Sequence, residues 1–190
     1  MKNNFWQQSA SAGLIIGALS IAAILLGYML TNVLELQEKA LLISSSLLGF
    51  FKIVILFTLL WNAAVRYARS QPEGTFSVAH GMGFIVMVMV FAGFLSGIGY
   101  YIQFVKLQPD YISDTVNQML QGKEETAQFT KQLLSSAAYW IMIAMFQMAF
   151  YGVLYGVFIA YFVRRRLAAI KDYQDNDSQE TENNSDETIQ

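Results

Sequence analysis

The chain has 190 residues, of which 55% are hydrophobic and 14% are charged, with a net charge of −2 and no cysteine. An average soluble domain carries roughly 25% charged residues, so this chain lacks the charge needed to cover a soluble surface. The composition excludes a disordered protein, a nucleic-acid-binding module and an ordinary cytosolic enzyme, and the lack of cysteine excludes disulfides and thiolate metal sites. It indicates a multi-pass membrane protein.

Four long stretches of the chain are almost free of charge. Residues 3–34, 74–105 and 132–163 contain no charged residue, and residues 40–65 contain only Lys52. A bilayer core about 30 Å thick needs about 20 apolar residues of α-helix, and backbone groups in lipid must bond internally. We therefore predict an all-α protein, a four-helix transmembrane bundle within a membrane domain of residues 1–171. The spans are expected near residues 10–32, 42–65, 76–104 and 134–163.

Positive charges divide unevenly between the two sides of such a bundle. With four spans, both termini and the second loop share one side, which holds seven lysines and arginines against four on the other. Because Lys and Arg accumulate in cytoplasmic loops, we expect both termini in the cytoplasm. The residues that set this topology are Arg66, Arg69, Arg164, Arg165 and Arg166.

The two longest segments outside the predicted spans are the outer loop and the C-terminal tail. In the outer loop, residues 106–131, Pro109 is followed by apolar residues at helical spacing and a stop at Gly122, which predicts a short helical hairpin. This hairpin is either an amphipathic connector on the headgroups, or a docking surface or lid. Residues 172–190 hold seven acidic residues and no lysine or arginine, so we predict a disordered acidic C-terminal tail.

Small residues recur one helical turn apart in three of the predicted spans. Such GxxxG pairs let helix backbones approach closely in lipid. They are either packing sites within one chain or a surface for homodimerisation. The pairs are Gly13 with Gly17, Gly93 with Gly97, and Gly152 with Gly156.

Two ionisable side chains in the predicted spans are candidate functional residues. Lys52 is the one charged residue in a span, and it either snorkels to the outer interface or forms a buried polar contact or ligand site. His80 is the only histidine, and with no nearby Cys, Asp or Glu it does not make a metal site. It either forms hydrogen bonds at the interface or has a pH-sensitive or ligand-binding role. No nucleophile–base pair or phosphate-binding loop is found, so we expect neither catalysis nor a cofactor.

Several short motifs occur in a characteristic order along the chain. They are Phe5-Trp6, Arg66-Tyr67-Ala68-Arg69, Gly74-Thr75-Phe76-Ser77, Gly99-Tyr100-Tyr101 and Pro109-Asp110-Tyr111-Ile112. In this order they resemble the bacterial membrane family DUF4199, a domain of unknown function. The resemblance covers about residues 4–168. It implies a four-span protein of the bacterial inner membrane, and it implies no catalytic residue.

Three functions are compatible with these features. We expect a non-catalytic scaffold or accessory protein of the bacterial envelope, in contact with the lipid bilayer and with a membrane-protein partner or a second copy. The alternative is a small oligomeric transporter or channel that uses Lys52 or His80. An enzyme acting on a lipid-linked substrate would have only Asp110 and Asp114 of the outer loop as plausible acids.

Overall fold

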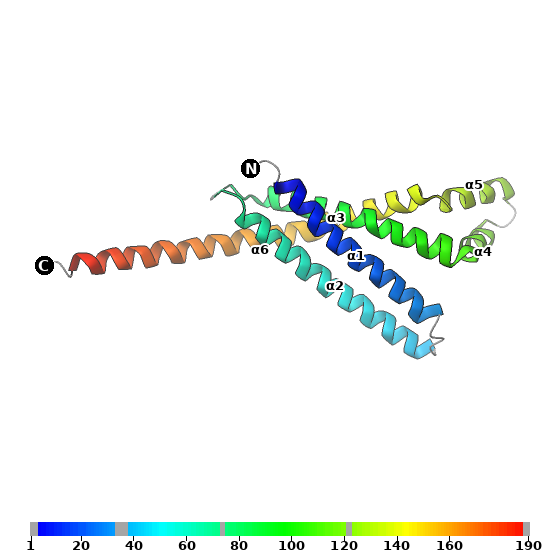
Figure 1. Cartoon of the computed structure of the whole chain (residues 1–190), viewed down its shortest axis with the longest axis horizontal. Helices are drawn as coiled ribbons and strands as arrows, with labels where there is room; N and C mark the ends of the chain where they lie inside the picture. Colours follow the sequence, from blue (N-terminus) through cyan, green and yellow to red (C-terminus); the bar gives the residue numbers. More distant parts are fainter. Residues whose placement is uncertain (1–3, 33–37, 73–74, 121–122, 188–190) are drawn as a thin grey trace.

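The computed structural model of the chain describes residues 4–32, 38–72, 75–120 and 123–187 (Figure 1). Its elements are α1 (Asn4–Asn32), α2 (Glu38–Arg69), α3 (Val78–Tyr101), the π-helix η1 (Ile102–Leu107), α4 (Pro109–Met119), α5 (Glu124–Leu134) and α6 (Ala137–Glu187). Four stretches are long and apolar enough to cross a membrane, namely Phe5–Asn32, Leu42–Arg69, Val78–Leu107 and Ala137–Ala169. The predicted all-α bundle of four such helices is confirmed.

The outside of the bundle is apolar. Phe146 of α6 is 73% exposed and Phe158 is 66% exposed, and α2 exposes Phe50, Phe51 and Phe57. Soluble monomers rarely expose contiguous apolar patches of this extent. Together with the length of the helices, this surface is the one that a lipid environment requires.

Helix α3 is the central element and packs antiparallel against α6. A Cβ at Gly93 would lie 2.7 Å from the Cα of Met145, and one at Gly152 would lie 3.0 Å from the Cα of Val86. Gly97 and Gly156 make the same kind of approach at the neighbouring turns. Two of the three GxxxG pairs therefore pack α3 and α6 of one chain against each other.

Helix α1 packs in parallel on another side of α3. A Cβ at Gly13 would lie 2.6 Å from the carbonyl oxygen of Val88, and one at Gly17 would lie 2.7 Å from the Cβ of Leu95. The third GxxxG pair is thus also used inside the chain. All three GxxxG pairs therefore pack helices of one chain against each other, which is the first of the two interpretations given above.

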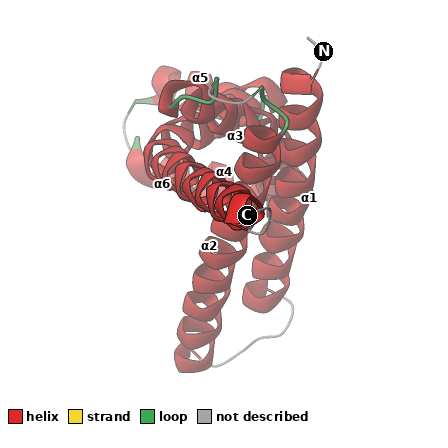
Figure 2. Ribbon diagram, turned by 90° about the vertical axis from the view of Figure 1, so that its left-hand side faces the viewer, coloured by secondary structure: helices red, strands yellow, loops and turns green. Residues whose placement is uncertain are grey.

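The two ends of the bundle differ. We call the end with Arg66, Arg69 and Arg164–Arg166 the arginine end and the opposite end, with α4 and α5, the hairpin end. At the arginine end α2 is buried through Leu60, Ala64 and Tyr67. Toward the hairpin end the α1–α2 pair diverges from α3 and α6 (Figures 1 and 2).

The predicted helical hairpin of the outer loop is present as α4 and α5, and Ile112 and Val116 of α4 are buried. The predicted stop at Gly122 lies outside the described residues. Residues 172–187, predicted to be disordered, continue the backbone helix of α6 and project away from the bundle (Figure 1). A helix without tertiary packing is marginal in water, and acidic residues near its C-terminus oppose the helix dipole.

Candidate functional site

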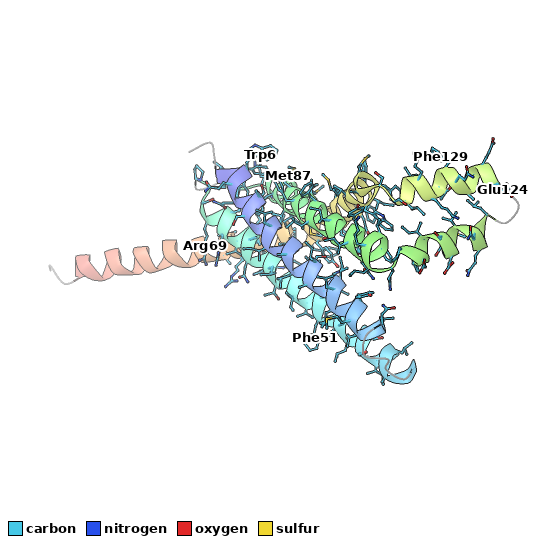
Figure 3. The ribbon with its side chains drawn as sticks, turned by 45° about the vertical axis from the view of Figure 1, so that its right-hand side comes forward. Trp6, Phe51, Arg69, Met87, Glu124 and Phe129 are labelled. Atoms are coloured by element: carbon cyan, nitrogen blue, oxygen red, sulfur yellow. The ribbon has the colours of Figure 1, made fainter. Side chains whose placement is uncertain are left out.

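A cavity of about 550 Å³ lies at the hairpin end, where the α1–α2 pair separates from the rest of the bundle. We call it the hairpin-end groove. Its walls come from α1 and α2 on one side and from η1 and the start of α4 on the other. Figure 3 shows these two arms, with Phe51 on α2 and Glu124 at the tip of the α4–α5 hairpin. The volume is within the range of about 300–1,000 Å³ that is typical of ligand pockets.

The groove changes from polar to apolar with depth. Tyr28, Thr31 and Gln103 line it within about 6 Å of the ends of their spans, at a rise of 1.5 Å per residue. Ala23 lies about 14 Å below Asn32, and Leu48 lies about 9 Å below Leu42. The groove therefore has a polar rim at the hairpin end and an apolar floor toward the middle of the bundle.

The polar groups of the rim are neutral, and several are not paired. Thr31 Oγ1 donates to the carbonyl of Gly27 at 2.9 Å, and Asn32 Nδ2 donates to the carbonyl of Tyr28 at 3.2 Å. The side-chain amides of Gln103 and Gln108, which also line the groove, form no hydrogen bond with any residue in the described ranges. Each amide offers two donors and an acceptor oxygen, so the rim is able to bind a polar group.

The π-helix η1 presents Gln103 and Phe104 to the groove. The Gln108 backbone N–H donates to the carbonyl of Gln103, five residues earlier, at 3.0 Å. Pro109 then begins α4. Short π-helical turns are rare and occur frequently at functional sites. Nothing in the sequence predicted this turn, because residues 102–107 contain neither Gly nor Pro.

An aromatic cluster holds η1 against the neighbouring helices. The ring of Phe104 stacks on Trp140 at 5.0 Å and on Tyr111 at 5.2 Å between centroids. Trp140 Nε1 in turn donates to the carbonyl of Leu134 at 2.7 Å. The wall of the groove formed by η1 is therefore fixed to both α4 and α6.

Lys52 lies on α2 one turn below Leu48, close to the floor of the groove but outside its lining. It is half-buried and about 15 Å from the start of the α2 span. It forms no hydrogen bond or ion pair with any residue that the structure describes. The geometry thus gives Lys52 neither a polar partner among the described residues nor a place in the groove.

His80 lies in the first turn of α3 at the arginine end and is exposed. Its backbone N–H donates to Ser77 Oγ at 3.2 Å, and the same oxygen is 3.1 Å from His80 Nδ1. Ser77 is the N-cap of α3, so the histidine belongs to a helix-capping arrangement. Lys52 is about 25 Å from the arginine end along α2, so the structure does not bring the two candidates together.

Two of the five arginines that we predict to set the topology come together from different helices. Arg69 at the end of α2 and Arg166 of α6 line a small depression together with Val65, Val163 and Leu167. Figure 3 shows Arg69 next to the emerging α6. All five arginines of this end are exposed.

Gln147 of α6 was not singled out as a site residue by the sequence. Its side chain is exposed on the outer surface of the bundle, between the exposed rings of Phe146 and Phe150. It makes no hydrogen bond within the part of the chain that the structure describes. A polar residue in a long apolar run indicates a candidate site. The run does not show whether that residue faces the other helices of the bundle or the outer surface.

Fold and site together define a four-span α-helical protein of the membrane type, with an amphipathic groove at one end. The family model described as "Protein of unknown function (DUF4199)" matches residues 11–165. The chain belongs to this family, as the order of its motifs predicted. No curated protein and no solved structure matches the chain significantly.

Proposed function

We propose that this protein is a non-catalytic accessory protein of the bacterial inner membrane that associates with another transmembrane helix along α6. The exposed and unpaired amide of Gln147 is the observation that carries this proposal. Gln147 is about 15 Å from the start of its span at Ala137, which is close to the middle of a bilayer core about 30 Å thick.

An amide at this depth favours a partner. An unpaired amide in an apolar environment costs about 1–3 kcal/mol by mutational estimates. Side chains such as Gln form hydrogen bonds between membrane helices, with measured contributions of about 0.6–2 kcal/mol. Ile143, Phe150 and Leu154 are exposed on the same face, one or two turns away. They give a partner helix an apolar stripe on which to pack around the amide.

The lining of the hairpin-end groove supports the non-catalytic part of the proposal. No charged residue lines the hairpin-end groove within the described ranges, and its hydroxyls and amides have no adjacent base. A transporter or channel that uses Lys52 or His80 has less support, because Lys52 lies outside the lining of the groove and His80 belongs to the helix-capping arrangement of α3.

Crosslinking from α6 tests the association. A photoreactive residue at position 150 should label a single membrane protein or a second copy of this chain. The same residue in place of Phe94, which is exposed on α3, should label lipid. Gln147→Leu should lower the yield at position 150 about fivefold, the equivalent of about 1 kcal/mol. Equal labelling from both positions, unchanged by Gln147→Leu, would refute the association.

The orientation is a further prediction. We place the arginine end and both termini in the cytoplasm, because Lys and Arg concentrate on the cytoplasmic side. A reporter that is active only in the cytoplasm should be active when fused after Lys171, and inactive when inserted between α4 and α5. The reverse pattern would invert the protein and would make the hairpin end cytoplasmic.

A further inference from the structure

The hairpin-end groove extends through only about half of the length of the membrane-spanning helices. A Cβ at Gly99 of α3 would lie 3.1 Å from Ile21 and 3.2 Å from Ile24, so α1 and α3 are in close contact just below the floor. Above this contact the groove extends about 14 Å from Ala23 to the end of the span at Asn32. This depth equals about half of a bilayer core 30 Å thick, which is the hydrocarbon depth of a single leaflet.

We propose that the hairpin-end groove binds one membrane lipid whose headgroup is uncharged and rich in hydroxyl or amide groups. The acyl part lies against the apolar floor of Ala23, Ile24 and Leu48, and the headgroup lies at the rim beside Gln103 and Gln108. This proposal uses a different surface from α6 and stands independently of the proposed association.

The depth of the groove favours a lipid over a protein helix. A transmembrane helix needs about 20 residues, or 30 Å, to cross the bilayer. A helix entering this groove would meet the packed α1–α3 contact after about half of that distance. A lipid occupies one leaflet, so its length matches the groove.

The chemistry of the rim selects the headgroup. The amides of Gln103 and Gln108, unpaired among the described residues, are each able to donate and accept hydrogen bonds. Tyr28 and Tyr111, which each carry a hydroxyl, line the same groove. No cation is among the described residues that line the groove, so the negative charge of a phosphate headgroup would have no counterpart there. Sugar hydroxyls and amides pair with such groups without a charge.

The geometry of the walls makes a defined site rather than a gap between helices. On one wall the π-turn directs Gln103 and Phe104 into the groove, and the stacking of Phe104 on Trp140 holds it there. On the other wall Gly27 leaves room, because the nearest atom to a Cβ at this position is Leu48 Cδ2 at 3.9 Å. A bulky side chain at position 27 would therefore enter the groove.

Lipid retention tests the proposal on the full-length protein. The protein is reconstituted in bilayers of phosphatidylethanolamine, phosphatidylglycerol and a glycosyl diacylglycerol, transferred to detergent, and its bound lipids are counted by native mass spectrometry. We expect one glycosyl diacylglycerol per chain. Gln103→Leu combined with Gln108→Leu should lower its retention about tenfold, and Gly27→Phe should abolish it.

The matched control is Gln118→Leu, the same chemical change at an exposed position of α4 outside the groove. It should leave retention unchanged, and thermal unfolding should show that all variants fold. Three results would each overturn the proposal. They are preferential retention of phosphatidylglycerol, lipid retention that the groove variants leave unchanged, and a protein helix crosslinked from position 27. Loss of crosslinking from position 150 would leave it intact, so the two proposals fail separately.

Discussion

Replacing Gly97 with alanine should lower the stability of the folded bundle by about 1–3 kcal/mol, the usual cost of overpacking a core. The added Cβ would lie 2.8 Å from the carbonyl oxygen of Trp140, and still closer to the Cα of Ile141. Both are backbone atoms of α6, which cannot turn aside like the end of a flexible side chain. Thermal unfolding in detergent micelles, followed by circular dichroism, measures the loss.

The control for this prediction is in the same helix. Nothing lies within 4 Å of a Cβ at Gly83, so Gly83→Ala should change stability by less than about 0.5 kcal/mol. Gly93→Ala should behave like Gly97→Ala, since its Cβ would lie 2.7 Å from the Cα of Met145. Equal effects at Gly83 and Gly97 would contradict the assignment of the GxxxG pairs to packing within the chain.

The helices themselves follow from features of the sequence that act locally. Lipid disfavours charge and obliges each segment to form its own backbone hydrogen bonds, so the windows with no charged residue, or with Lys52 alone, locate all four long helices. The helical hairpin was also predictable, because Pro109 begins α4 and the apolar Ile112 and Val116 recur at helical spacing. The GxxxG pairs predicted close contacts between helices, but they did not predict which helix each pair would contact.

The groove was not predictable, because lipid removes the pattern that distinguishes the two faces of a helix. In water, an apolar stripe marks the buried face, whereas in lipid both faces are apolar. Phe84 and Phe94 of α3 illustrate this, since the first is 1% exposed and the second is 45% exposed. The same holds for Gln103 in the groove and Gln147 on the outer surface, which are both glutamines in apolar runs.

Tertiary geometry decides the rest of the site. The groove joins Gly27 of α1 with Gln103 of η1, which are far apart in the sequence, and it exists only because α2 diverges from α3 toward the hairpin end. No local pattern encodes that divergence. It depends on where the α1–α2 pair is attached to the central helix.

That attachment is the subject of the last prediction, in which Phe84→Ala should lower stability by about 3–5 kcal/mol. The ring of Phe84 stacks on Tyr67 of α2 at 4.2 Å with an interplanar angle of 1°, and it meets the edge of Phe5 of α1 at 6.0 Å. One side chain of α3 thus contacts both helices of the diverging pair at the arginine end.

Phe94→Ala removes the same ring from the exposed face of α3 and should cost less than about 1 kcal/mol, because no core cavity is left behind. Unfolding of both variants in the same detergent gives the comparison. A Phe84 variant as stable as the Phe94 variant would mean that the α1–α2 pair is held elsewhere.

If Phe84 attaches the α1–α2 pair to α3, its loss should also release the α1–α2 wall of the hairpin-end groove. Lipid retention should then fall in Phe84→Ala, although no groove residue has changed, and should persist in Phe94→Ala.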